Sequence, residues 1–219
     1  MSFTTSATAT EGVIKFHLDF TLAQPEPLEK IAELSSWRQI LYRLGLTGQE
    51  PDRYDGLAFG NVSQRTGRTS FLISGTRTGC KACLSAEDYC LVLDTSLLEN
   101  RIRATGPIEP SSEALAHGAV YASNPTAGCV IHAHSPDIWR NALGLGIPLT
   151  DTSIAYGTPE MGRAVGDAAA RESVGIIAMG GHEDGVLAFD RTPCLAAVRL
   201  LQTLEKALEF DLRKCVENE

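Results

Sequence analysis

The chain has 219 residues, of which 43% are hydrophobic and 21% charged, so it can bury the core of one ordinary globular domain. A formal net charge of −8 and a pI near 5.2 argue against a nucleic-acid partner, because no basic surface is available to neutralise phosphates. No apolar run has the length of a membrane span, and the segment MSFTTSATATEG lacks the basic and apolar regions of a secretory signal, so we expect a cytoplasmic protein with reduced cysteines. Cys80 and Cys83 form a single C-x-x-C, which without a second such pair does not predict a zinc knuckle.

The N-terminal part begins with a segment rich in Ser, Thr and Ala, and we expect residues 1–12 to be loosely packed. Residues 13–20, VIKFHLDF, alternate apolar and polar side chains, which predicts a half-exposed extra strand with His17 on its solvated side. Residues 28–46 follow a break at AQPEP and show an amphipathic pattern, which predicts a helix ended by Gly45.

The next part of the chain predicts a loop followed by a hairpin. Residues 46–60 have a loop composition, and two short strands are predicted within residues 61–76, on either side of a Thr66-Gly67 turn. Residues 85–102 contain an apolar core that fits either a helix end or a strand. The favoured interpretation is a short helix from Ser85 followed by a strand.

The middle of the chain predicts a helix and then a strand. Residues 109–125, EPSSEALAHGAVYASNP, predict a helix with Ser111 or Ser112 near its N-cap and a stop at Asn124-Pro125. The apolar run GCVIHAHSP comes next and predicts a strand that ends in two histidines.

The C-terminal half alternates helices and strands. A short helix is predicted over residues 136–146, and a second one over residues 158–173 has Pro159 in its first turn. Residues 174–190 predict two strands joined by a glycine-rich turn, and residues 192–215 predict a long amphipathic helix. Because no linker or repeat interrupts this pattern, residues 1–219 are expected to form one α/β domain with helices covering a central sheet.

Three of the five histidines suggest a metal centre. His132 and His134 alternate with Ile131 and Ala133, so in a strand both imidazoles point to the same face. The pair alone fits a hydrogen-bonded strand end equally well. His182, in the glycine-rich turn GGHEDG, is the candidate third ligand, and three protein ligands with one open position are typical of catalytic zinc.

A carboxylate and a group of anion donors accompany the histidines. Glu113 opens the helix directly before the His-x-His strand, where it could reach the metal or simply favour the helix dipole. His117 lies one turn further on and is interpreted as a core or supporting residue. The segments GNVS, ISGT and PSSE offer backbone and hydroxyl donors of the kind that binds phosphate without lysine. These donors are Gly60, Asn61, Ser74, Gly75, Thr76, Ser111 and Ser112.

The segments GNVSQR, ISGT, PSSEALAHGAVY, VIHAHSP and GGHEDGVLAF, in this order, resemble the class II aldolase/adducin family over residues 35–210. That family includes fuculose-phosphate and rhamnulose-phosphate aldolases, ribulose-phosphate 4-epimerase, methylthioribulose-phosphate dehydratase and certain decarboxylases. The resemblance implies one three-layer α/β/α domain with a largely antiparallel sheet, assembled as a homotetramer.

The resemblance also implies a site and a reaction. His132, His134 and His182 would bind a divalent metal, usually zinc, although imidazoles also suit manganese or cobalt. Glu113 would be the acid/base carboxylate. The substrate phosphate would be held by Gly60, Asn61, Ser74, Gly75, Ser111 and Ser112. The expected activity is cleavage or formation of a C–C bond in a small phosphorylated ketose through an enediolate that the metal stabilises as a Lewis acid.

Other functions and some departures from the family pattern stay open. An epimerase, dehydratase or decarboxylase would use the same metal site, and a non-catalytic adducin-like module would need none. A cupin fits poorly, because Ile138 and Trp139 stand where its glutamate is expected. Glu183 and Asp184 replace a shorter His-Gly pattern. They could support the ligands, supply an extra ligand or be solvated turn residues, and the last is the favoured interpretation. The tyrosine proton donor of some aldolases has no clear counterpart, and Tyr156 is only a candidate substitute.

Overall fold

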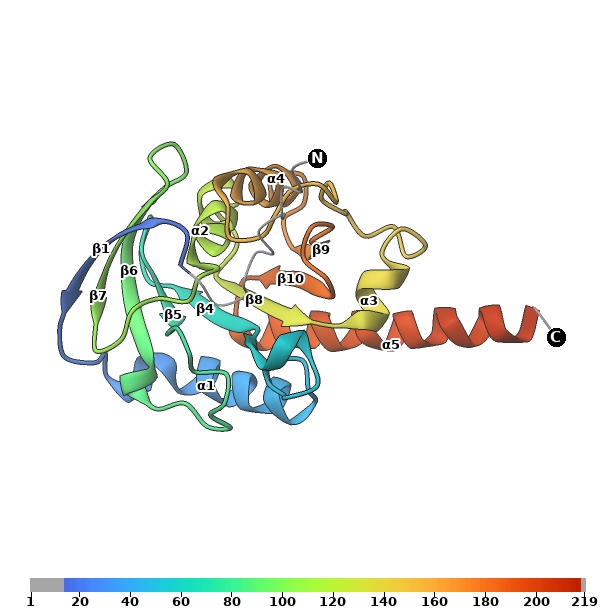
Figure 1. The fold of residues 1–219 in the computed structure, drawn as a ribbon, viewed down its shortest axis with the longest axis horizontal. Helices are drawn as coiled ribbons and strands as arrows, with labels where there is room; N and C mark the ends of the chain where they lie inside the picture. The colour runs from blue at the N-terminus through green and yellow to red at the C-terminus, as the bar shows by residue number, and fades with distance from the viewer. Residues whose placement is uncertain (1–13, 218–219) are drawn as a thin grey trace, which may run out of the picture.

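The computed structural model describes residues 14–217, so the expectation for residues 1–12 lies outside the described range. Eight strands form one sheet in the order β1-β7-β6-β5-β4-β8-β10-β9, and β2 pairs with β3 in a small second sheet (Figure 1). The elements in chain order are β1 (His17–Leu22), α1 (Leu28–Arg43), β2 (Gly48–Gln49), η1 (Tyr54–Gly56), β3 (Ala58–Phe59), β4 (Asn61–Arg65), β5 (Phe71–Ser74), η2 (Ala86–Asp88), β6 (Tyr89–Ser96), β7 (Arg101–Gly106), α2 (Ala114–Ser123), β8 (Cys129–His134), α3 (Pro136–Asn141), α4 (Pro159–Ala169), β9 (Gly175–Ala178), β10 (Gly185–Asp190) and α5 (Pro193–Glu217).

The large sheet is antiparallel at every described pairing except that of β1 with β7, which is parallel. Helices α2 and α4 cover one face, and α1, α3 and α5 cover the other (Figure 1). The expected α/β fold with a largely antiparallel sheet between helical layers is therefore confirmed.

Alternation along β8 shows how the sequence builds these layers. Val130 points into the core beneath α2 and α4, while Cys129, Ile131 and Ala133 belong to the core against α1, α3 and α5. Every residue of β8 is buried, as expected of a central strand covered on both faces. The same alternation places the two histidines on the α2/α4 face.

The observed ends of some elements differ from the predicted ones. The strand expected over residues 13–20 covers His17–Leu22 instead, because the Asn100 side chain and backbone hold the chain around Lys15 and His17 at the edge of β7. His17 is exposed, as expected. The helix expected to have Ser111 or Ser112 near its N-cap has Glu113 at that position.

The long segment 85–102 resolves into more structure than was predicted. The short helix and strand expected after Ser85 are confirmed as η2 and β6, but the chain then turns back as β7. Asn100, with φ of +47°, begins the return, and its left-handed backbone explains the sharp turn.

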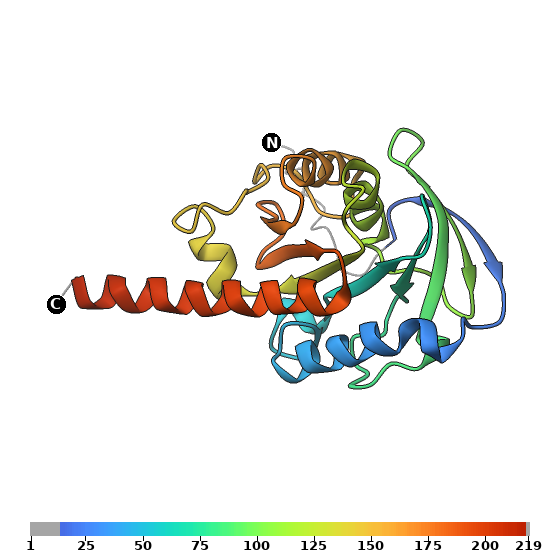
Figure 2. The same cartoon turned by 180° about the vertical axis from the view of Figure 1, so that it is seen from behind.

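Helix α5 extends beyond the rest of the described structure, as Figure 2 shows. Leu208, Leu212 and Val216 on this projecting part are 52%, 66% and 68% exposed. Among the helices of residues 14–217, none combines the length and apolar character that crossing a membrane requires. Cys80 and Cys83 are exposed free thiols.

Candidate metal centre and adjoining pocket

The two histidines of β8 are held between two neighbouring strands. His132 lies opposite Asn61 of β4 and Leu187 of β10, and His134 lies opposite Gly185 at the start of β10. Directly opposed residues on neighbouring strands share a face, so Asn61 stands beside His132 on the α2/α4 side. The turn that leads into β10 brings His182 to the same place.

The three imidazoles converge. His132, His134 and His182 each offer a ring nitrogen within 4.8 Å of the others, and their ring centroids are 4.7–5.1 Å apart. Their exposed fractions are 1%, 0% and 3%. They are the one such group of metal-ligating side chains that residues 14–217 contain.

The donor set fits a divalent cation. Nδ1 of His132 lies 3.2 Å from the carbonyl oxygen of Val186, which can only accept, so Nδ1 carries the proton. Nε2 then has a lone pair, and this buried atom has no hydrogen-bond partner within residues 14–217. Burial, together with the neighbouring imidazoles, lowers the pKa of His132 well below 6.5, which keeps the ring in the neutral form that binds metal.

Glycine makes the turn of His182 possible. A Cβ on Gly181 would overlap the carbonyl oxygen of Ile154, so only glycine fits this close backbone approach. The amide of His182 donates to Met179 and its carbonyl accepts from Gly185, at 3.1 and 2.9 Å. The imidazole therefore projects from a turn that is fixed on both sides.

A pocket beside His132 brings several expected site residues together. Backbone pairing of Gly75 with Pro110 aligns the ISGT and PSSE segments, which are distant in the sequence. Glu113 and His132 line this pocket together with mostly small residues and one arginine: Ala58, Gly60, Asn61, Gly75, Thr76, Arg77, Thr78, Gly79, Ser111 and Ser112.

Ser74 stands apart from this group. It does not line the pocket, and its hydroxyl oxygen accepts a hydrogen bond from the amide of Val62 at 3.2 Å. Its side chain thus supports β4, whereas the next residue, Gly75, reaches the pocket wall.

The pocket also contains residues that the sequence did not indicate. Thr78 donates to the carbonyl of Gly75 at 2.9 Å, and Arg77 has a left-handed φ of +58°. The guanidinium of Arg38, 3% exposed, donates to backbone carbonyls of the segment 78–82. The local signal that could have pointed to this anchoring role is the place of Arg38 on the apolar side of the helical pattern, between Leu34 and Leu41.

Glu113 is 4% exposed and lies near a lysine from outside the expected motifs. The Nζ of Lys15 donates to the carbonyl of Tyr156 at 2.9 Å and lies 4.2 Å from the centroid of its ring. A Cβ on Gly157 would be 3.8 Å from this Nζ and 3.9 Å from Oε1 of Glu113. Burial lowers the pKa of Lys15, and the nearby charge of Glu113 raises it. The Lys15 ammonium and the Glu113 carboxylate therefore both lie beside Gly157.

Tyr156 and the two acidic residues of the turn have defined places in the fold. The ring of Tyr156 stacks on His182 with centroids 4.2 Å apart, so it adjoins the candidate ligands. Glu183 is exposed, as expected for a solvated turn residue. The same interpretation was wrong for Asp184, which is half-buried because its Oδ2 accepts a hydrogen bond from the hydroxyl of Tyr54 at 2.7 Å.

Solved structures share the fold. L-fuculose-1-phosphate aldolase from Thermus thermophilus superposes with a TM-score of 0.63 at 22% identity, over 88% of this chain and 97% of that one. A sugar-phosphate aldolase from Thermotoga maritima gives 0.63 at 19% identity, over 87% and 97%. The N-terminal class II aldolase domain of a conserved Thermoplasma acidophilum protein gives 0.56 at 17%, over 86% and 96%.

No curated protein sequence matches the chain. The family model for the class II aldolase and adducin N-terminal domain matches residues 51–212, which is most of the chain and contains all three histidines of the cluster. The chain therefore belongs to the class II aldolase and adducin family.

Proposed function

We propose that this chain is a divalent-metal-dependent lyase that cleaves or forms a C–C bond in a small phosphorylated ketose. The observation that carries the proposal is one pocket in which His132 of the histidine cluster meets the buried carboxylate of Glu113 and a wall of small polar residues. Each of these parts is common, but their combination is what an aldol cleavage requires.

His132, His134 and His182 would hold the cation, with zinc as the first choice and manganese or cobalt as alternatives. When bound, the cation supplies a Lewis acid for the negative charge that develops beside a carbonyl. The chain contributes a neutral imidazole at His132, since burial disfavours its protonated form.

Glu113 would move the proton. Its carboxylate is buried at the N-cap of α2 and lines the same pocket as His132. A positioned carboxylate of this kind contributes about 10²- to 10⁴-fold to a proton transfer. The positive charge of Lys15 nearby favours the ionised carboxylate that accepts the proton.

Another part of the lining suits a phosphate group. The hydroxyls of Ser111 and Ser112 can donate to its oxygens, and Arg77 adds a positive charge. The amides of Gly75 and Thr76 already donate to the carbonyls of Asp88 and Glu109, so these two residues would shape the wall rather than donate from their backbone. Gly60 has φ of +75°, and a Cβ there would lie 2.7 Å from Cγ2 of Thr47, so the wall depends on glycine at this position.

The proposal is tested by metal analysis of the purified protein, followed by a screen of short ketose phosphates for release of an aldehyde. We expect one divalent metal per chain, lost from His132→Ala, and Glu113→Gln should retain the metal while turnover falls about a hundredfold or more. Glu109→Gln, which alters an exposed glutamate four residues earlier in the segment before α2, is the matched control and should retain wild-type turnover.

The outcomes separate the possible functions. A protein without bound metal, or His132→Ala with unchanged activity, would refute the metal-dependent lyase and leave a binding module. Consumption of a ketose phosphate without a carbonyl fragment would reassign the reaction to epimerisation or dehydration at the same site. Release of carbon dioxide would indicate decarboxylation.

A further inference from the structure

Tyr54 contacts one side of the histidine cluster. Its ring meets His134 edge-on, with centroids 4.4 Å apart and planes at 70°, and packs in the same manner on Phe59 at 5.1 Å. Its hydroxyl accepts a hydrogen bond from Nη2 of Arg53 at 3.0 Å and donates to Oδ2 of Asp184 at 2.7 Å. Tyr54 thus touches one imidazole and is bonded to the turn that carries another.

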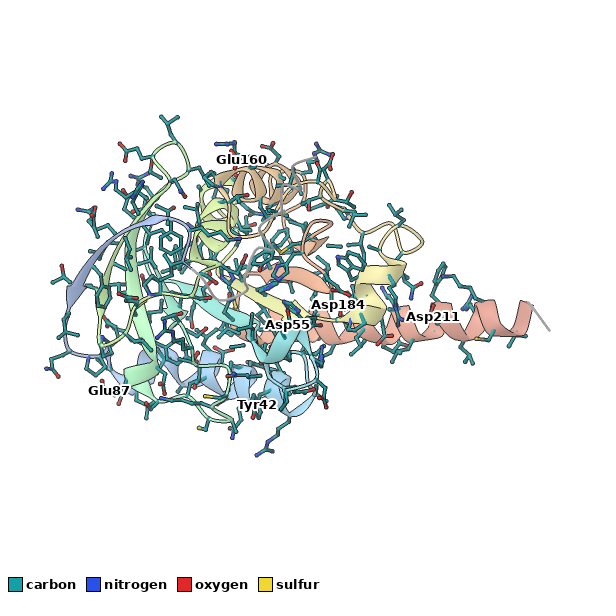
Figure 3. The ribbon with its side chains drawn as sticks, in the orientation of Figure 1. Tyr42, Asp55, Glu87, Glu160, Asp184 and Asp211 are labelled. Carbon is teal, nitrogen blue, oxygen red and sulfur yellow. The ribbon has the colours of Figure 1, made fainter. Side chains whose placement is uncertain are left out.

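Asp184 completes the connection between the two histidines. It lies two residues after His182, and its backbone carbonyl accepts from the amide of Ser135 at 2.8 Å, directly after His134. Figure 3 shows Asp184 close to Asp55, the neighbour of Tyr54, near the end of β8. The side chain and the backbone of Asp184 therefore tie the His182 turn to two different segments.

The backbone at these positions is unusual. Tyr54, Asp55 and Asp184 have φ of +50°, +57° and +60°, in the left-handed region that side chains with a Cβ seldom adopt. For an aromatic residue this conformation persists only where surrounding contacts impose it, and such residues are concentrated at functional sites. Arg53, which also donates to the carbonyl of Gly45 at 2.9 Å, supplies one of these contacts.

We propose that Tyr54 and Asp184 are positioning residues that fix the distance between His134 and His182 and thereby strengthen metal binding. The inference rests on the proposed metal-dependent function. Groups that orient metal ligands typically change metal affinity about 10- to 100-fold when removed.

The test measures the zinc dissociation constant by competition with a chromogenic chelator, for wild type, Tyr54→Phe, Asp184→Ala and the double variant. Tyr54→Phe keeps the ring against His134 and removes only the hydroxyl. We expect each single variant to bind zinc about tenfold more weakly, and the double variant to be no weaker than either, because one bond is lost in all three. Asp184→Asn, which retains an acceptor, should stay within about threefold of wild type.

The control is Glu183→Ala, which removes the exposed carboxylate next to Asp184 and should leave zinc affinity unchanged. Unchanged affinity in Tyr54→Phe and Asp184→Ala would overturn the inference, and so would tighter binding in Tyr54→Phe, which would mean that Asp184 had been released to the cation. If wild type itself binds no divalent metal, the proposed function fails first and the inference fails with it. Thermal melting of the metal-free variants identifies any that has simply unfolded.

Discussion

His117 should make the stability of this protein depend on pH through one buried ring. Its Nδ1 lies 2.7 Å from the hydroxyl of Ser63, which is also hydrogen-bonded to the Tyr121 hydroxyl at 2.8 Å. The ring is fully buried, and Nε2 has no hydrogen-bond partner within residues 14–217. Burial lowers the pKa of His117 from 6.5 to about 3.

The sign follows from proton binding. Between the two pKa values the unfolded chain protonates this histidine and the folded chain does not, so stability is lost as the pH falls below 6.5. At about pH 5 the gap of about 1.5 units corresponds to about 2 kcal/mol less free energy of unfolding than at about pH 7. Urea unfolding at the two pH values measures the total loss, to which His132, whose pKa is also lowered by burial, contributes in the same direction.

A pair of variants isolates the effect. His117→Asn keeps a polar group near Ser63 but cannot titrate, so the pH-dependent loss should shrink by about 2 kcal/mol relative to wild type. Tyr121→Phe removes a hydroxyl from the same network and should lower stability by about 1 kcal/mol at both pH values while keeping the wild-type dependence. If His117→Asn loses as much stability in acid as wild type does, this ring is not the cause and the reasoning is refuted.

Three further predictions concern the site and the assembly. Lys15→Met should lower kcat roughly tenfold at unchanged metal content and KM, because it removes the positive charge near Glu113. A changed KM with an unchanged kcat would contradict this. Gly181→Ala should weaken zinc binding by about tenfold or more in chelator competition, because the added Cβ would clash with the Ile154 carbonyl and displace the His182 turn. A variant that binds zinc as tightly as wild type would disprove this prediction. Leu208→Glu, on the exposed apolar part of α5, should reduce the size of the expected homo-oligomer in light scattering with helix content unchanged, and an unaltered mass would exclude this face.

Local periodicity was sufficient for most of the fold. The apolar run of β8, the amphipathic pattern of α1 and Pro159 at the start of α4 are signals within a single element, and each element formed where expected. Strand β7 was missed because its two arginines at alternate positions, Arg101 and Arg103, leave few apolar residues, and its pairing with β6 and β1 is a tertiary fact. A strand that is stabilised mainly by pairing with other strands cannot be predicted from the apolar pattern of its own segment.

The candidate site divides in the same way. The histidines and Glu113 were found because their spacing reports a face or a helix start. Lys15 and Tyr54 had no such signal: the first belongs to an edge segment and the second to a loop, and only the fold brings either one near the cluster. Asp184 was misjudged because an acidic turn residue looks solvated until its partner, 130 positions away in the chain, is known.

Lys15 and Tyr54 are connected to the histidine cluster by two separate sets of contacts. Lys15 contacts Tyr156, whose ring stacks on His182, while Tyr54 packs against His134. Aromatic rings thus restrict two of the three imidazoles, and the third is fixed by the bond of His132 to a backbone carbonyl. If the three histidines bind a cation, they would lose little further rotational freedom, because much of the entropic cost of ordering them is met during folding. The contacts of Tyr54, Tyr156 and the Val186 carbonyl therefore account for the order of the three imidazoles.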